Sequence, residues 1–242
     1  MIFKHLDWDS NFFSKRIGRI DLTPADSEQD LENEIRSHQE YDLLYIFSDN
    51  QLLLPHKDFR CKLADQKVTF IGNLTSNEPK KPENTNIIIT ESNHESTPKE
   101  LELLAYQSGE FSRFKTDTRF DPNDFYRLYK KWIDNSVSKE IADNIYIAFW
   151  KEIIAGFVTV QHTQDYSKID LIAVDQDFQG HKIGSSLMDH IIYMSWQKGI
   201  KKIYVDTQAA NIKACGFYLH KGFSKHKIVN IYHYWLNNSS NQ

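Results

Sequence analysis

The sequence predicts an α/β protein in two parts. Apolar runs of strand length alternate along the chain with segments whose apolar residues recur at helical spacing. One polar segment with two prolines, "LTSNEPKKPENTN", interrupts this alternation. With 242 residues the chain is long enough for one large domain or two small ones. We expect a smaller N-terminal α/β unit over residues 1–74, a linker over 75–86 and a larger α/β domain over 87–238.

The first part contains one helical segment followed by two strand candidates. Residues 26–38, "DSEQDLENEIRSH", predict a helix, and the apolar run "YDLLYIF" at 41–47 predicts a strand after it. In residues 65–72, "DQKVTFIG", polar and apolar side chains alternate, as on a half-buried strand. These elements predict the small α/β unit.

The second part begins its helices with capping residues. Asp121 with Pro122, and Thr97 with Pro98, predict an N-cap followed by proline at the first helical position. Strands are predicted at 86–90, 144–150, 152–162, 167–175, 201–207 and 226–236, and helices at 97–111, 121–137, 179–200 and 211–223.

Composition excludes several classes of protein. A net charge of −4 argues against a nucleic-acid-binding protein, which usually carries a basic face. No apolar run reaches the roughly 18 residues of a membrane helix, and the acidic, aromatic N-terminus is unlike a signal peptide. Two distant cysteines, Cys61 and Cys215, form neither a disulfide framework nor a zinc pattern, so we expect no metal. We therefore expect a soluble, cytoplasmic protein.

The segment "QGHKIGSSLM", which follows a predicted strand, has the character of a phosphate-binding loop. Gly180 and Gly184 let a pyrophosphate approach the backbone, and Ser185 adds a hydroxyl group. The first amides of a helix are unpaired and lie at the positive end of its dipole, so they bind anions readily. A surface turn before a helix is the alternative interpretation.

A second motif, "NIKACGFY", places three residues on one face of a helix. Asn211, Ala214 and Tyr218 are spaced i, i+3 and i+7. At 1.5 Å per residue the three span about 10 Å.

These two motifs together resemble the GNAT acetyltransferase superfamily. "LIAVDQDFQGHKIG" is similar to its acyl-CoA-binding segment, in which Gln179, Gly180 and Gly184 match the pattern. Lys182 replaces the central glycine of that pattern, and Gln176 stands where proline is common. The resemblance implies a GNAT fold, with a mixed, mostly antiparallel sheet that is splayed at the cofactor site and flanked by helices.

The resemblance also implies roles for individual residues toward acyl-CoA. Backbone near Ile172, Ala173 and Val174 would hold the pantetheine and supply the oxyanion donor, and Tyr218 would protonate the leaving thiolate. The remaining cofactor-binding residues implied are Gln179, Gly180, Lys182, Ile183, Gly184, Ser185, Asn211 and Ala214.

Stretches along nearly the whole chain also resemble the N-acyltransferases of dTDP-linked amino sugars, the family of TDP-fucosamine acetyltransferase. They include "LDWDSNFFSKRIGRID", "LADQKVTF" and "SRFKTDTRF". The resemblance implies transfer of an acetyl or longer group, such as 3-hydroxybutanoyl, to the amine of a dTDP-linked amino-dideoxyhexose. Such a reaction serves the biosynthesis of surface polysaccharide, the O-antigen of lipopolysaccharide or capsule. The resemblance also implies that Asp65 is a candidate general base and that Ser112, Arg113 and Phe114 are candidate substrate-binding residues.

Several residues keep alternative interpretations. Asp65 is otherwise an exposed strand residue, and Arg113 binds either a diphosphate or a surface carboxylate. Trp8, with Phe12 and Phe13, is interpreted as core packing rather than a base-stacking platform, and Cys215 as packing rather than a nucleophile. The rival functions are a GNAT enzyme for another amine, such as an aminoglycoside, a polyamine or a protein N-terminus, and a non-catalytic acyl-CoA sensor. The acyl length, the sugar carbon and a homodimer stay open.

Overall fold

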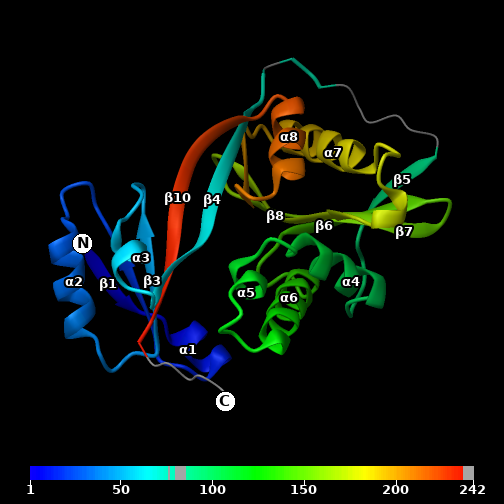
Figure 1. Cartoon of the computed structure of the whole chain (residues 1–242). Helices are drawn as coiled ribbons and strands as arrows, with labels where there is room; N and C mark the ends of the chain where they lie inside the picture. Colours follow the sequence, from blue (N-terminus) through cyan, green and yellow to red (C-terminus); the bar gives the residue numbers. More distant parts are fainter. Residues whose placement is uncertain (76, 80–85, 237–242) are drawn as a thin grey trace. The chain divides into compact units, whose positions relative to one another are not determined.

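The chain divides into two compact units. The computed structural model describes residues 1–75, 77–79 and 86–236 (Figure 1). Unit 1 comprises Met1–Val68, Gln208–Ala210 and the residues from Lys227 onward, and unit 2 comprises Thr69–Thr207 and Asn211–His226. Most of the predicted linker, residues 76 and 80–85, lies outside the described residues.

Unit 1 is a small α/β unit. Its elements are β1 (Ile2–His5), α1 (Asp7–Phe13), β2 (Ile17–Asp21), α2 (Glu28–Ser37), β3 (Leu43–Ser48), α3 (Leu54–Lys57), and parts of β4 (Cys61–Asn73) and β10 (Ser224–Trp235). The strand order is β1-β2-β3-β10, with a parallel β2–β3 pair between two antiparallel pairs. The register of β10 on β3 runs from Asn230 opposite Ser48 to Trp235 opposite Leu43. Thus residues nearly the whole chain apart share one sheet.

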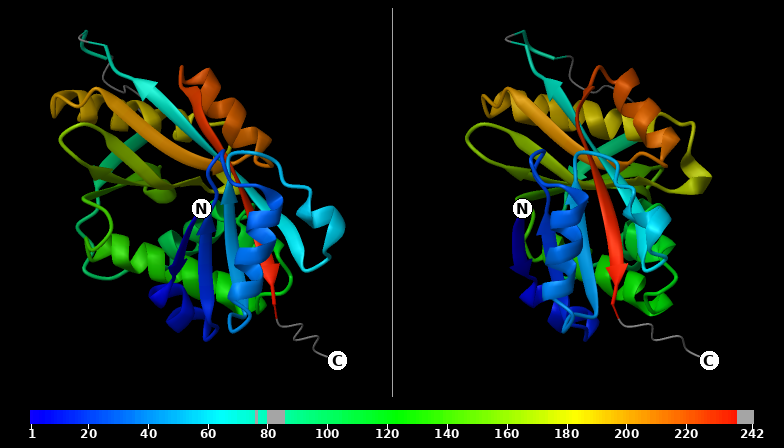
Figure 2. Two further views of the ribbon diagram at one scale, coloured as in Figure 1. Left: turned by 90° about the vertical axis from the view of Figure 1, so that its left-hand side faces the viewer. Right: turned by 60° about the vertical axis from the view of Figure 1, so that its left-hand side comes forward.

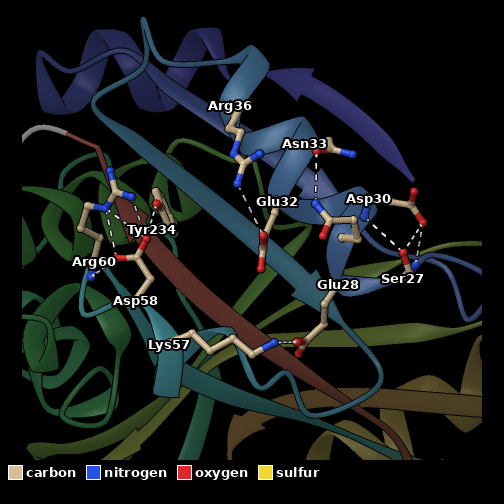
Figure 3. A network of polar contacts seen from close by, with 11 residues as sticks. Ser27, Glu28, Asp30, Glu32, Asn33, Arg36, Lys57, Asp58, Arg60 and Tyr234 are labelled. Atoms are coloured by element: carbon tan, nitrogen blue, oxygen red, sulfur yellow. Dashed lines mark hydrogen bonds and ion pairs between the residues drawn. The ribbon is translucent and has the colours of Figure 1, made fainter.

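A polar network surrounds helix α2 of unit 1 (Figure 3). Ser27 and Asp30 form a reciprocal capping box at the start of α2, which satisfies two of the unpaired amides there. Lys57 Nζ lies 2.8 Å from a carboxylate oxygen of Glu28. Near it, Asp58 accepts hydrogen bonds from Arg60 at 2.7 Å and from the Tyr234 hydroxyl at 2.6 Å.

Unit 2 contains a mixed sheet with helices on both faces (Figure 2). Its elements after β4 are β5 (Ile87–Glu91), α4 (Lys99–Ser108), α5 (Arg113–Thr116), α6 (Pro122–Val137), β6 (Asn144–Trp150), β7 (Ile153–His162), β8 (Ser167–Val174), the 3-10 turn η1 (Gln176–Phe178), α7 (Ile183–Gln197), β9 (Lys202–Gln208) and α8 (Ile212–His220). The strand order is β4-β9-β8-β7-β6-β5. The pairs from β5 to β8 are antiparallel and β8–β9 is parallel. The predicted mixed α/β fold is confirmed.

The helices α4 and α6 bury an apolar face against the sheet of unit 2. Leu101 and Leu104 of α4 and Phe125 of α6 pack with Leu171 and Ala173 of β8. Helix α7 covers the opposite face (Figures 1 and 2). There the Ser195 hydroxyl on α7 lies 2.7 Å from the Ser167 hydroxyl on β8, and both side chains are buried.

Strands β8 and β9 part in the middle of β8. Their register covers three pairs, which end at Ile169 opposite Val205. At the same point β8 carries a bulge, because Asp170 and Leu171 together face the single residue Thr159 of β7. The buried Thr159 hydroxyl accepts the amide of Leu171 at 3.0 Å. A bulge bends its strand, so the predicted splay has a local cause here. We call this point the β8–β9 fork.

Two expectations at side chains are wrong. Helix α4 begins at Lys99 with Pro98 at its N-cap, and the Thr97 hydroxyl instead donates to Asp134 of α6 at 2.7 Å. Trp8 is 47% exposed, so it is not a core residue, although its ring stacks on Phe12 at 4.9 Å. Phe13 is buried as expected.

Candidate active site

The turn between β8 and α7 is held by a hydrogen bond to β7 and by the side chain of its first residue, Asp175. The amide of Asp175 donates to the carbonyl of Ala155 at 2.9 Å, and the Asp175 carboxylate accepts the amide of Asp177. Gly180 has a φ of 86°, and Lys182, the N-cap of α7, has a φ of 64°. Lys182 thus adopts the left-handed conformation that suits glycine, at a cost of about 1–2 kcal/mol. The lysine therefore preserves the turn despite replacing a glycine.

The first turn of α7 has the features of an anion site. Within the described residues, the Lys182 side chain does not cap the helix, and the first intrahelical backbone bond runs from Ser186 to the Lys182 carbonyl. The amides of Ile183, Gly184 and Ser185 are therefore those that a helix leaves unpaired. Ile183 is buried, so only its backbone is suited to contact a ligand. Gln179 and Gly180, like Lys182, are exposed beside this turn.

Three elements meet at Gly184. A Cβ atom on this glycine would lie 3.5 Å from Cγ2 of Val174 and 3.7 Å from the ring of Phe217. These are ordinary van der Waals distances, so a Cβ atom would fit here. It would occupy the space between the end of β8, the start of α7 and α8. Gly156 on β7 has a different role. A Cβ there would lie 2.8 Å from the Ala173 carbonyl oxygen, which is too close. The absence of a side chain at Gly156 therefore lets β7, β8 and α7 approach one another closely.

The end of β8 supplies backbone beside this space. Ile172 and Val174 are half-buried and alternate with Ala173, which is buried on the face of α4 and α6. Ala173 therefore contributes only its backbone to the α7 side. Beyond Ile169, β8 has no residue in register with β9 in the part of the chain that the structure describes. Backbone groups at that edge are suited to hydrogen-bond an extended ligand.

Helix α8 carries the second motif. The Asn211 side-chain oxygen accepts the amide of Ala214 at 3.0 Å and so caps the helix, which leaves the amide nitrogen of Asn211 as the donor for a ligand. Tyr218 is 3% exposed and packs against Phe70 and Phe223. Burial raises the pKa of the Tyr218 phenol well above its usual range, with smaller contributions from Cys215 and Asp206. The phenol is therefore protonated at neutral pH.

The other candidate residues lie apart from these elements in the sequence. Asp65 is half-buried on β4, in unit 1. Ser112 is buried and caps α5 by accepting the amide of Phe114. Phe114 is also buried and packs on Phe120, while the Arg113 guanidinium lies over the Phe114 ring at 4.4 Å. Ser112 and Phe114 thus have local structural roles, and their part in substrate binding stays a prediction.

Two carboxylates that the sequence did not single out lie at the β8–β9 fork. Asp170 and Asp206 each follow the last register pair, Ile169 opposite Val205, on their own strands. Lys168 Nζ lies 2.9 Å from Oδ1 of Asp170, and Thr69 of β4 donates to Asp206. In the sequence, each aspartate is the third residue of a tripeptide, "KID" on β8 and "YVD" on β9. These tripeptides indicate a pair of acids only when the parallel register of the two strands is known.

Other kinds of site are not found among the described residues. No group of three or more His, Cys, Asp or Glu side chains is arranged to hold a metal ion. In the same part of the chain, no helix is both long and apolar enough to cross a membrane.

Comparison with known proteins identifies the domain that contains these elements. Residues 104–223 match the family model described as Acetyltransferase (GNAT) family. Over 257 aligned residues the chain is 21% identical to the spore coat polysaccharide biosynthesis protein SpsD of Bacillus subtilis (strain 168), covering 97% of this chain and 83% of that protein. It is 29% identical over 80 residues to the [ribosomal protein bS18]-alanine N-acetyltransferase of Escherichia coli (strain K12), covering 33% of this chain and 54% of that protein.

A solved structure supports the same fold. The GCN5-related N-acetyltransferase from Sphaerobacter thermophilus superposes with a TM-score of 0.52 at 13% identity, over 89% of this chain and 67% of that one. Residues 104–223 hold the fork, the start of α7 and the motif helix α8. The domain that residues 104–223 form therefore belongs to the GNAT family of acetyltransferases.

Proposed function

We propose that this protein transfers an acyl group from acyl-CoA to the amine of a dTDP-linked amino-dideoxyhexose, in the synthesis of surface polysaccharide. The observation that carries this proposal is the extent of the similarity to SpsD, whose name assigns it to spore coat polysaccharide biosynthesis. That similarity covers 97% of the chain, so it includes unit 1 as well as the acetyltransferase domain. A GNAT fold by itself does not name the acceptor.

The cofactor side of the proposal rests on the fit between acyl-CoA and unit 2. The first amides of α7 are suited to the pyrophosphate, and Gln179, Gly180 and Lys182 border them. The open edge of β8 from Ile172 to Val174 is suited to the amide groups of pantetheine, with the Asn211 side-chain amide as a further donor. Gly184 and the half-buried Ala214 have little or no side chain, so they add little bulk beside the proposed ligand.

The chemistry proposed for the protein is positioning, oxyanion stabilisation and donation of a proton to the leaving group. A backbone amide near Val174 would stabilise the oxyanion, because such a donor is fixed before the reaction. The Tyr218 phenol is protonated at neutral pH and would donate to the departing thiolate. Holding both substrates together contributes up to about 7–11 kcal/mol to lowering the barrier. Asp65 is a candidate for the base, and Ser112, Arg113 and Phe114 are candidates for binding the sugar nucleotide.

The experiment is a measurement of thiol release from acetyl-CoA and 3-hydroxybutanoyl-CoA in parallel. The acceptors are dTDP-3-amino- and dTDP-4-amino-dideoxyhexoses, with the free amino sugars, an aminoglycoside and a polyamine as controls. We expect release only with a dTDP-linked acceptor, and the responsive pair identifies the acyl group and the sugar carbon. Release with the free sugars at equal efficiency would contradict a nucleotide-linked acceptor.

A second candidate acceptor is a protein N-terminus. The observation in its favour is the 29% identity over 80 residues to an enzyme named as an alanine N-acetyltransferase of ribosomal protein bS18. A peptide that begins with alanine therefore belongs in the same acceptor panel. Acyl-CoA binding without turnover of any acceptor would instead favour a sensor.

A further inference from the structure

The β8–β9 fork contains a carboxylate oxygen for which the fold provides no partner. Oδ2 of Asp170 is buried and accepts no hydrogen bond within the described part of the chain, while Oδ1 is held by Lys168 at 2.9 Å. A buried polar atom without a partner costs free energy, roughly 1–3 kcal/mol, so it calls for an explanation. Asp170 lies in the bulge of β8, directly after the last residue that is in register with β9. The unpartnered oxygen therefore belongs to a residue at the β8–β9 fork.

Asp170 lies on the face of the sheet opposite α7. Ser167, which precedes the bulge, contacts Ser195 of α7, and Val174, which follows it, lies near Gly184 at the start of α7. Lys168 and Asp170 alternate with Ser167 and therefore lie on the other face. If acyl-CoA binds along α7 as proposed, Asp170 is on the far side of the splayed strand, where a second substrate would reach the thioester through the fork.

We propose that Asp170 accepts the proton of the acceptor amine in the acyl transfer reaction. This proposal rests on the proposed function, since it needs an amine acceptor and an acyl-CoA donor in unit 2. The amine nitrogen forms its bond to the thioester carbonyl carbon and gives a proton to Oδ2 of Asp170. The carbon–sulfur bond then breaks, and the departing thiolate takes a proton from Tyr218. Tyr218 regains a proton from solvent and Asp170 releases its proton to solvent, so both groups return to their starting forms.

The neighbours of Asp170 suit it to this role. Two charged side chains act on it, Lys168 from its own strand and Asp206 from β9, together with the polar Gln161 from β7. Burial raises the pKa of Asp170, and Asp206 raises it further, while Lys168 and the polar Gln161 side chain lower it. A carboxylate with a raised pKa is a stronger base, and the nearby Lys168 ammonium group favours its ionised form. Lys168 and Asp206 therefore act on Asp170 in opposite directions.

The test compares pH profiles of kcat/KM for four variants with the acceptor that the wild type uses best. We expect Asp170→Asn to lower kcat by about 100-fold or more and to remove the acidic limb of the profile, without changing the Kd of acyl-CoA. Asp206→Asn should move the acidic limb to lower pH, and Lys168→Gln should move it to higher pH. A purely structural role of the fork would not give two shifts of opposite sign. Asp165→Asn removes an exposed aspartate in the turn before β8 and should leave the profile unchanged.

A rival variant and a second measurement make the result decisive. Asp65→Asn tests the other candidate base, and loss of the acidic limb in that variant while Asp170→Asn retains it would overturn the proposal. Carboxyl NMR titration of the free protein measures the pKa of Asp170 without an acceptor, and no response to Asp206→Asn or Lys168→Gln would also overturn it. If no dTDP-linked acceptor reacts but another amine does, the proposed function fails, and the same variants test Asp170 with that amine.

Discussion

Lys182 illustrates how one residue departs from a family pattern while the backbone keeps its path. Its φ of 64° is the conformation for which glycine is favoured, and a lysine tolerates it only with strain. Lys182 is exposed at the start of α7, so its ammonium group is suited to attract the proposed pyrophosphate. The sequence predicted the turn and the start of this helix although the glycine pattern was incomplete, and the anion site at that turn stays a prediction.

The residue-scale prediction for catalysis concerns Tyr218. We expect Tyr218→Phe to lower kcat by about 100-fold or more, because the leaving thiolate loses its proton donor. The Kd of acyl-CoA should change little, since the ring still fills the pocket formed with Phe70 and Phe223. Steady-state kinetics and calorimetric binding of acyl-CoA separate the two quantities.

The matched control for this prediction is Tyr193→Phe. Tyr193 lies on α7, and its hydroxyl accepts a hydrogen bond from Gln197 in an exposed pair. Turnover of this variant should equal that of the wild type. A Tyr218→Phe enzyme with normal turnover would remove Tyr218 from its proposed role.

Two histidines in unit 2 predict how stability depends on pH. Burial lowers the pKa of His162 on β7, with Lys198 adding to the effect, and burial lowers the pKa of His190 on α7. The folded state therefore favours their neutral forms, and the unfolded chain binds more protons below its pKa of about 6.5. Their contribution to stability is complete above that pH and is lost as the pH falls toward their folded-state pKa values.

Urea denaturation at several values between pH 5 and 8 measures this dependence. We expect the free energy of unfolding to fall below about pH 6.5. The variant His162→Gln with His190→Gln should show a weaker fall than the wild type. An equal fall in both proteins would mean that other groups cause the loss of stability.

At the scale of elements, the bulge in β8 joins the architecture of the sheet to the candidate site. Two residues of β8 face Thr159, and the Thr159 hydroxyl satisfies the amide of Leu171, which the bulge takes out of the regular ladder. Since the bend begins where β8 leaves β9, the same element opens the fork and positions Asp170. A threonine on the neighbouring strand thus stabilises the irregularity that the site requires.

Substitution of Thr159 tests this account. Thr159→Val keeps the size and branching of the side chain but leaves the buried amide of Leu171 without an acceptor. We expect it to lower the free energy of unfolding by about 1–3 kcal/mol. Denaturant titration measures the change, with Thr159→Ser as the control that retains the hydroxyl and should be less destabilised. Equal destabilisation of the two variants would show that the methyl group, not the hydroxyl, matters.

Helix ends that are marked by nearby residues could be predicted from the sequence. Features that depend on how distant strands pair could not. The pair Asp121–Pro122 marked the start of α6 correctly, because an N-cap acts within one turn. The Thr97–Pro98 pair predicted a cap that the structure does not have, since the Thr97 hydroxyl bonds to Asp134 on another helix. The fork and its acids depend on pairing between β7, β8 and β9, about which a single sequence says little.

At the scale of the whole molecule, neither unit is one continuous piece of chain. Unit 1 takes residues from the start, from Gln208–Ala210 and from Lys227 onward, so its sheet includes β10. The alternation of elements predicted an α/β fold, but it did not show that the last strand joins the first part of the chain. Long-range pairing of this kind leaves no periodic signal near the residues that make it.

A truncated chain tests the consequence of this arrangement. A chain that begins at Thr69 lacks β3, the partner of Asn230–Trp235. Four apolar side chains that are buried in the intact protein would then lose their surroundings in unit 1: Ile231, Tyr232, Tyr234 and Trp235. We expect this chain to aggregate, as measured by size-exclusion chromatography. Co-expression with residues 1–68 should restore a soluble species, and a monodisperse truncated chain would contradict the prediction.

The shared strand also determines the order of events on the ribosome. Ser48 of β3 is opposite Asn230 of β10, so Asn230 is synthesised 182 residues after its partner. At roughly 5–20 residues per second, β3 waits about 10–40 s for its partner. During that interval one edge of an apolar strand is without its final neighbour, and a nascent chain in this state is a natural client for a chaperone.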